Sequence, residues 1–350
     1  MYSLVVLASL LLPGIANAQY TMVKEYIGEH FFDDWSFYNN FDNLTNGDAF
    51  FVSASDASKD KLAFVNNAGN AIMQVDNFTN VDFNTKRNSI RITSNDQYTV
   101  GSLWIADIMH VPYGCSVWPA WWASAPNWPD GGEIDTLEGV NQVTMSHMAL
   151  HTSPGCMQSN TSVETSKLVN TTDCSTAVNN NEGCTVTNPG PTYGPEFAAG
   201  GGGVFVTEFA AKGISIWYFN RTNIPKSIQG NASSVDTSTL GTPVANWASD
   251  GCKITEFFEP QQLVFDITLC GDFAGNDAIF QQTCSGICYE DFVLGPPSYY
   301  DTAYFEVSYV RVYGLPGELT VIGSGAPRSA DIVGMLSLLV GVVAALLLTW

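Results

Sequence analysis

Short stretches that alternate polar and apolar residues recur along most of the chain. Such alternation is typical of strands that bury one face. Segments rich in Asn, Gly, Pro and Asp separate the stretches and favour turns, and no long helical periodicity is present. The stretches span 89–94, 102–111, 143–151, 203–210, 213–219, 262–269 and 304–313. Many short strands at loose spacing predict an all-β fold, a two-sheet sandwich of the jelly-roll type.

The two ends differ from the rest of the chain. Residues 1–18 hold an apolar run that closes with Ala16-Asn17-Ala18, which predicts a signal peptide cleaved before Gln19. Residues 332–350 are uncharged and follow small residues and a short polar spacer. This pattern predicts a glycolipid (GPI) attachment signal over 323–350, with a membrane-spanning tail as the alternative. Release of the protein from cells by phosphatidylinositol-specific phospholipase C would support the lipid anchor, and a mature chain that keeps 332–350 would contradict it.

The segment between these ends, 19–322, shows no repeat and no linker, so we expect one large domain. It carries features of an exported protein, which we expect to be secreted and tethered to the cell surface or cell wall. The chain has eight cysteines, whose pairing the spacing leaves open. They are residues 115, 156, 174, 184, 252, 270, 284 and 288. Six N-glycosylation sequons begin at Asn43, Asn77, Asn160, Asn170, Asn220 and Asn231.

The net charge of −21 bears on the partners of the protein. It argues against nucleic acid and anionic lipid, and it is compatible with a neutral polysaccharide. We therefore expect membrane contact only through the C-terminal anchor, and a monomer. No cysteine–histidine cluster has the spacing of a zinc site, and no metal or cofactor is predicted.

One long segment lacks strand signals. Residues 153–202 are rich in Asn, Thr and Gly and include three cysteines. We expect a surface insertion held by disulfides, of the kind that often lies beside a functional site. The Gly-rich run 198–203 is expected to be a loop, because it precedes no helix and matches no phosphate-binding pattern.

The sequence GGEIDTLEGV concentrates three acids, Glu133, Asp135 and Glu138, in a chain of which only 13% is charged. In a strand, Glu133 and Asp135 project to one face, whereas Glu138 would point the other way. One extra residue in a β-bulge would return Glu138 to the same face. Two glutamates that converge there would suit the retaining mechanism of glycosidases. A solvated turn is the alternative for an isolated motif of this kind.

Four tryptophans precede the acids and favour the sugar-binding interpretation, because indole faces stack on sugar rings. We expect Trp118 and Trp122 to lie in the core, and Trp121 and Trp128 to be exposed and to bind substrate.

The stretch 114–156, with Glu133-x-Asp135-x-x-Glu138 after a Trp/Pro-rich strand, resembles glycoside hydrolase family 16. Within that family it is most similar to the fungal laminarinase-like endo-β-1,3(4)-glucanases, and the resemblance runs from about residue 30 to 315. It implies a concanavalin A-like jelly roll with a concave substrate cleft. It also implies that Glu133 is the nucleophile, that Glu138 is the general acid/base and that Asp135 tunes the pair.

The resemblance further places His151 in the cleft and Phe273 at a position where the family often has tryptophan, in CGDFAG. The predicted activity is therefore hydrolysis of β-1,3 or mixed β-1,3/1,4-glucan with retention and without a cofactor. Two alternatives remain: a cell-wall transglycosylase that uses the same site, and a non-catalytic glucan-binding β-sandwich. The three intact acids argue against the second alternative.

Overall fold

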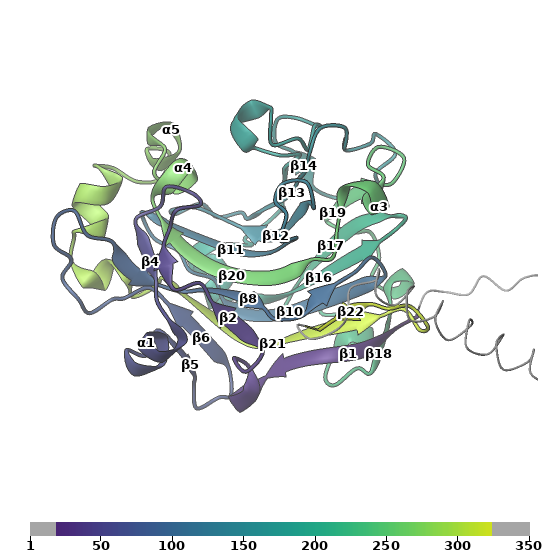
Figure 1. Ribbon diagram of the computed structural model, residues 1–350, viewed down its shortest axis with the longest axis horizontal. Coiled ribbons are helices and arrows are strands. Elements are labelled where there is room, and N and C mark those ends of the chain that lie inside the picture. The colour runs from purple at the N-terminus through teal and green to yellow at the C-terminus, as the bar shows by residue number, and fades with distance from the viewer. Residues whose placement is uncertain (1–18, 324–350) are drawn as a thin grey trace, which may run out of the picture.

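The computed structural model describes residues 19–323, which form two large β-sheets packed face to face (Figure 1). The predicted signal peptide and the apolar tail 332–350 lie outside the described residues. Among the residues that are described, no helix has the length and apolar character needed to cross a membrane.

Within this part of the chain, an eight-stranded antiparallel sheet carries the acids. Its outer face is concave (Figure 1). In spatial order its strands are β14 (Lys167–Leu168), β15 (Val186–Thr187), β13 (His147–His151), β12 (Glu133–Glu138), β11 (Val117–Ser124), β20 (Gln262–Leu269), β8 (Arg91–Ser94) and β2 (Trp35–Phe37).

The second sheet of the described chain has nine antiparallel strands and backs the first. Its main path is β18 (Ser234–Asp236), β1 (Gln19–Ile27), β21 (Tyr304–Gly314), β10 (Ser102–His110), β16 (Gly203–Ala210), β17 (Gly213–Asn220) and β19 (Ala245–Ala248). The strand β6 (Ala71–Gln74) pairs with β21 and with β5 (Ala63–Val65).

The remaining strands and α-helices are short. They are β3 (Asn40–Phe41), β4 (Ala49–Phe51), β7 (Arg87–Ser89), β9 (Gln97–Tyr98), β22 (Val321–Ile322), α1 (Ala54–Lys59), α2 (Gly194–Ala199), α3 (Ile254–Phe257), α4 (Gly271–Ala274) and α5 (Asp277–Phe280). Helices α4 and α5 lie near the loops around β4 at one end of the sandwich (Figure 1). Asn46 donates to the Asp272 carboxylate there.

The core lies between the two sheets, where strand alternation directs apolar side chains inward. Ile134 and Leu137 of β12 are fully buried in it. A smaller apolar cluster covers the outer face of the nine-stranded sheet around Trp217 and Val235. The predicted strands 203–210 and 262–269 match β16 and β20, whereas 143–151 shortens to β13 and 89–94 divides between β7 and β8.

The segment 153–202 is held by disulfides, as predicted. Cys174 pairs with Cys184 inside the segment, and Cys156 pairs with Cys252 outside it. The other two bonds join Cys115 to Cys284 and Cys270 to Cys288. Contrary to the sequence-based expectation, the segment contributes two short strands, β14 and β15, to the edge of the eight-stranded sheet. The Gly-rich loop is also shorter than predicted, because α2 ends at Ala199 and β16 begins at Gly203.

Five of the six sequon asparagines are exposed, and Asn77 is half-buried. The Asn77 side-chain nitrogen, to which a glycan would attach, donates to Asp301 at 2.8 Å. Glycosylation stays a prediction at all six positions.

Candidate active site

A β-bulge in β12 brings Glu133, Asp135 and Glu138 to the concave face. Asp135 and Glu138 are three residues apart, yet their partners on β13, Ala149 and His147, are only two apart. The extra residue leaves both Thr136 and Leu137 pointing into the core, where the Thr136 hydroxyl lies 2.7 Å from that of Thr207 on β16. The predicted bulge is confirmed, and it places all three carboxylates on one side of the sheet.

A tight turn sets the start of β12. Gly132 has a φ of +74°, and a Cβ atom at this position would lie 2.4 Å from the Phe258 ring. Only glycine accommodates both constraints, so Gly132 fixes the point at which Glu133 enters the strand.

Each glutamate receives one indole N–H. The Trp118 indole on β11 donates to Glu138 at 2.7 Å. The Trp128 indole, in the loop between β11 and β12, donates to Glu133. Because an N–H donor favours the ionised form of a carboxyl, both bonds oppose the effect of burial on the glutamates.

His151 lies beside the acids, on the β13 position that pairs with Glu133. Its Nε2 is 3.2 Å from Asp135 Oδ2, and its Nδ1 is 3.1 Å from the side-chain oxygen of Asn181. One nitrogen thus bonds an amide oxygen and the other lies at ion-pair distance from a carboxylate, which suits the protonated imidazolium.

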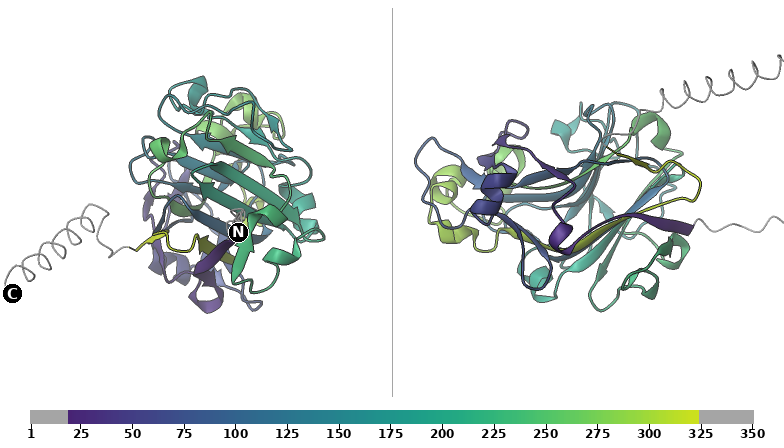
Figure 2. Two further views of the ribbon diagram at one scale, coloured as in Figure 1. Left: turned by 90° about the vertical axis from the view of Figure 1, so that its right-hand side faces the viewer. Right: turned by 60° about the horizontal axis from the view of Figure 1, so that its bottom comes forward.

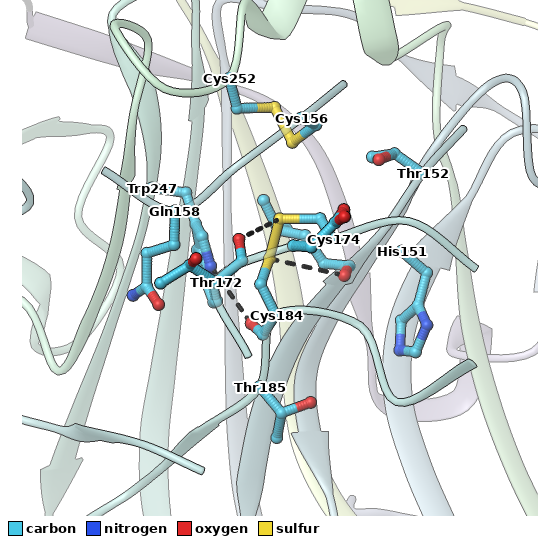
Figure 3. Close-up of a disulfide and its surroundings, with 12 residues drawn as sticks. His151, Thr152, Cys156, Gln158, Thr172, Cys174, Cys184, Thr185, Trp247 and Cys252 are labelled. Atoms are coloured by element: carbon cyan, nitrogen blue, oxygen red, sulfur yellow. Dashed lines mark hydrogen bonds between the residues drawn. A yellow bond between two sulfur atoms is a disulfide. The ribbon is translucent and has the colours of Figure 1, made fainter. Parts of the chain in front are cut away.

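The disulfide-bonded loop 174–184 fixes this orientation. Figure 3 shows His151 beside the Cys174–Cys184 bond, on a neighbouring segment. A Cβ atom at Gly183, whose φ is +67°, would approach the His151 ring to 2.9 Å, so the loop packs closely against the imidazole. The insertion thus supplies Asn181 to the site.

The pKa values of the cluster are strongly shifted. Burial and the neighbouring Asp135 raise the pKa of Glu133 to about 8. Burial also raises the pKa of Glu138 to about 7, against the Trp118 hydrogen bond and the charge of His151. Burial alone would lower the pKa of His151, but the hydrogen bond to Asp135 and the acid charges raise it to about 10. His151 is therefore the cation of the cluster at neutral pH.

Glu133, Asp135 and His151 could in principle hold a metal ion, because one possible ligand atom from each lies within 4.8 Å of the others. A metal requires neutral imidazole as its ligand, whereas the raised pKa of His151 favours the protonated ring. The predicted absence of a metal stays a prediction.

The expected orientation of three tryptophans was wrong. Trp121 is fully buried in the core and stacks on Phe265 with ring centroids 4.2 Å apart. Trp118 and Trp122 are instead half-buried on the concave face. The reason is cross-strand pairing: Trp122 is opposite Asp135 and Trp121 is opposite Leu137, and paired residues share a face. Trp128 is 47% exposed, as expected.

Three further residues of the concave face were missed by sequence reasoning. Asp266 on β20 accepts the Trp122 indole N–H at 3.1 Å and pairs with Arg91 at 3.0 Å. The Arg91 guanidinium lies 4.9 Å from the centroid of the Trp122 ring. His147 pairs with Glu138 across β12 and β13. Asp266 thus binds the edge of the Trp122 ring and Arg91 covers one of its faces.

Phe273, on α4, is half-buried and meets Trp118 edge-on, with ring centroids 5.5 Å apart. Its ring also lies 6.3 Å from that of His147. Because Trp118 donates to Glu138, Phe273 lies near the Glu138 side of the acids. Contact with substrate stays a prediction for Phe273 and His151.

Comparison with known proteins matches this geometry to a family. Residues 35–313 match the XgeA-like catalytic GH16 domain, a span that holds all three acids. The chain belongs to glycoside hydrolase family 16 (GH16). A probable glycosidase of Schizosaccharomyces pombe is 39% identical to this GH16 chain over 306 residues, which cover 86% of this chain and 71% of the relative. The endo-1,3(4)-beta-glucanase xgeA of Emericella nidulans is 34% identical over 328 residues, 91% of this chain and 51% of that protein. The GH16 chain thus spans about half the length of this second relative.

Solved GH16 structures share the fold. Laminarinase 16A from Phanerochaete chrysosporium, with two β-glucans in its donor and acceptor sites, superposes with a TM-score of 0.80 at 32% identity. That match covers 85% of this chain and all of the laminarinase. An elongating GH family 16 beta-1,3-glucosyltransferase gives a TM-score of 0.77 at 35% identity, covering 84% of this chain and 99% of its own. The predicted family and jelly-roll sandwich are confirmed.

Proposed function

We propose that this GH16 protein is a retaining endo-β-glucanase that hydrolyses β-1,3 or mixed β-1,3/1,4-glucan. The observation that carries the proposal is the bulge in β12, which gathers Glu133, Asp135 and Glu138 on the concave face beside Trp118 and Trp122. Relatives and solved neighbours named as endo-1,3(4)-β-glucanase or laminarinase support the substrate class.

In the proposed reaction, the ionised Glu133 attacks the anomeric carbon of the glucan. The bond to the leaving oxygen breaks as that oxygen takes the proton of Glu138, and a covalent glycosyl–Glu133 ester forms. Water then gives a proton to Glu138 and attacks the same carbon, which releases Glu133. Two inversions at one carbon give overall retention.

The charge beside the nucleophile has its own part in this scheme. His151, held by Asn181, keeps a positive charge near Glu133 and Asp135 and so favours the ionised nucleophile. In the free site the pKa of Glu133 is nevertheless above that of Glu138. The division of roles therefore rests on the positions of the residues in the motif and not on the order of their pKa values.

Product profiles on laminarin, lichenan and cellulose test the proposal. We expect short oligosaccharides from laminarin, from lichenan or from both, and none from cellulose. Turnover of cellulose alone, or of none of the three, would refute the proposed substrate.

Transglycosylation is the second candidate, because the elongating glucosyltransferase gives a TM-score of 0.77, close to the 0.80 of the laminarinase. The same glycosyl–Glu133 ester would then pass to a sugar hydroxyl in place of water. Products longer than the starting laminari-oligosaccharide would favour this function, and shorter products alone would favour hydrolysis. Membership of a catalytic GH16 domain family disfavours the non-catalytic alternative.

The pH dependence of kcat/KM should reveal Glu138 as the acid. The active form needs Glu138 protonated and Glu133 ionised, and their pKa values are raised to about 7 and about 8, so activity should peak between these values and fall on both sides. Trp118→Phe removes the N–H that stabilises the ionised form, so it raises the pKa of Glu138 and should move the pH optimum upward by about a quarter to half a unit. Asp266→Asn removes a nearby negative charge and should move it downward. Shifts of both variants in the same direction would contradict the assignment.

Trp128 should both bind the substrate and orient Glu133. We expect Trp128→Ala to lower kcat/KM on laminarin by roughly tenfold to a hundredfold at an unchanged melting temperature, because each large side chain lost from a sugar contact costs about 1–3 kcal/mol. Trp128→Phe keeps a ring but removes the bond to Glu133, so it should affect kcat more than KM. Unfolding of the alanine variant would show that the indole is structural.

A further inference from the structure

A second hollow, of about 680 Å³, lies away from the acids, beyond the start of β11 and the end of β12. This size is within the range of about 300–1,000 Å³ that small-molecule sites usually have. Its wall comes from the segment before β11, from Gln142 after β12 and from the 283–302 segment that follows α5. The side of the sandwich formed by that last segment is seen in Figures 1 and 2 next to α4 and α5. We name this hollow the Tyr113–Tyr299 pocket. Its lining residues are Tyr113, Gly114, Cys115, Gln142, Thr283, Cys284, Ser285, Phe292, Tyr299 and Thr302.

The lining of the Tyr113–Tyr299 pocket has no charged residue, although the protein carries a net charge of −21. Another hollow of the described residues differs, because Glu208, Lys212 and Asp236 line it. There Glu208 is already bonded to Tyr20, Thr237 and Lys212. An uncharged polar pocket on a strongly acidic protein suits a neutral, hydroxyl-rich ligand better than an ion.

The pocket is built from parts that are tied together. The disulfide between Cys115 and Cys284 joins two sides, and the Gln142 side chain donates to Cys115 Sγ at 2.8 Å. On the third side, Thr302 and Tyr113 exchange two hydrogen bonds, of 2.8 and 3.2 Å. Covalent and hydrogen-bonded links across the walls mean that little ordering would accompany binding.

The groups that line the pocket match the chemistry of a sugar. Tyr299 is 48% exposed and packs on Phe292 with ring centroids 5.6 Å apart, so its ring offers an apolar surface at the rim. Within residues 19–323, the phenol hydroxyls of Tyr113 and Tyr299 and the Ser285 hydroxyl bond no other protein group, so they are open to a ligand. Rings that stack on the apolar faces of a pyranose, with hydroxyls that bond its edge, are the usual means of holding a neutral sugar.

We propose that the Tyr113–Tyr299 pocket is a second binding site for β-glucan, separate from the catalytic acids. The identity of the ligand rests on the proposed function, because the polymer that the acids cleave is neutral and rich in hydroxyls. A polymer also has segments outside the catalytic face that a second site can bind. Holding one segment raises the effective concentration of the others at the acids. The second site therefore acts on polymeric and insoluble glucan and leaves short oligosaccharides unaffected.

The test measures retention of the protein on insoluble β-1,3-glucan particles, in a Glu133→Gln background that does not degrade them. Tyr299→Ala removes the exposed ring, and Ser285→Trp fills the hollow without removing a side-chain hydrogen bond to the rest of the described protein. Each should weaken the apparent affinity by about fivefold to tenfold, the loss expected for one stacked ring. Phe83→Ala, which removes a 67% exposed ring outside the pocket, should leave retention unchanged.

A second measurement uses the active enzyme. Tyr299→Ala should leave kcat/KM on laminaritetraose within about twofold of the unmodified protein, because a tetrasaccharide on the acids is too short to need a second site. Unchanged retention of both pocket variants, or an equal loss on laminaritetraose, would overturn the proposal. If Tyr299→Ala lowers the melting temperature, the retention of the Ser285→Trp variant alone tests the proposal. Failure of the unmodified protein to cleave both laminarin and lichenan would refute the proposed function instead, and retention would still report on the pocket.

Discussion

Replacing Glu133 with glycine is expected to abolish hydrolysis of laminarin, with a loss on the order of 10⁴-fold or more, as is usual when a catalytic nucleophile is removed. The glycine leaves space on the face from which Glu133 would attack. Added azide should enter that space and displace an activated leaving group directly, which gives an α-glycosyl azide by a single inversion.

Glu138→Ala should behave differently, because it keeps the nucleophile and loses the proton donor. It should still form the glycosyl–Glu133 ester from substrates whose leaving group needs no proton, and azide should then give a β-glycosyl azide. The exposed Glu256, changed to alanine, is the matched control and should keep full activity. The opposite stereochemistry in the two variants would reverse the assigned roles. Full activity in either variant would show that these acids are not the catalytic residues.

The largest effect on stability is expected from Trp121→Ala. Its indole is fully buried and stacks on Phe265, so the substitution opens a cavity between the sheets. Truncation of a buried Trp or Phe costs about 3–5 kcal/mol. In a domain of this size that corresponds to a melting temperature lower by about 5–10 °C, measured by calorimetry.

The neighbouring residue provides the comparison. Trp122 is half-buried on the concave face beside Asp135, so Trp122→Ala should keep the melting temperature within a few degrees. It should instead lower kcat/KM by roughly tenfold to a hundredfold through loss of a sugar contact. If Trp121→Ala lost activity without loss of stability and Trp122→Ala unfolded, the faces assigned by the strand register would be wrong.

Trp121 and Trp122 also show which structural features the sequence could predict and which it could not. Alternation along VWPAWWAS separates Trp121 from Trp118 and Trp122, and that separation is correct. The alternation does not tell which face meets the core. Pairing with β12 decides which face is buried, because Trp122 is opposite Asp135. The bulge in β12 also shifts the pairing register with both adjacent strands, β11 and β13.

The acid motif was predictable because its parts are local. Glu133, Asp135 and Glu138 lie in one strand, and the need to bring three acids together implied one extra residue. Contacts between distant parts of the chain were not predictable in this way. The bond from Trp122 to Asp266 joins residues 144 positions apart, and Asn181 reaches His151 from a loop whose shape depends on the Cys174–Cys184 disulfide. No local pattern marks Asp266 or Asn181.

Glu133 and Glu138 are thus assigned as nucleophile and acid/base of a double displacement. Proton NMR of the first products from laminarin tests this assignment most directly, because it records the anomer before mutarotation. The proposed mechanism predicts that the β-anomer forms first and that the α-anomer follows only as the sugar equilibrates. Initial formation of the α-anomer would show inversion by a single displacement and would contradict the assigned role of Glu133.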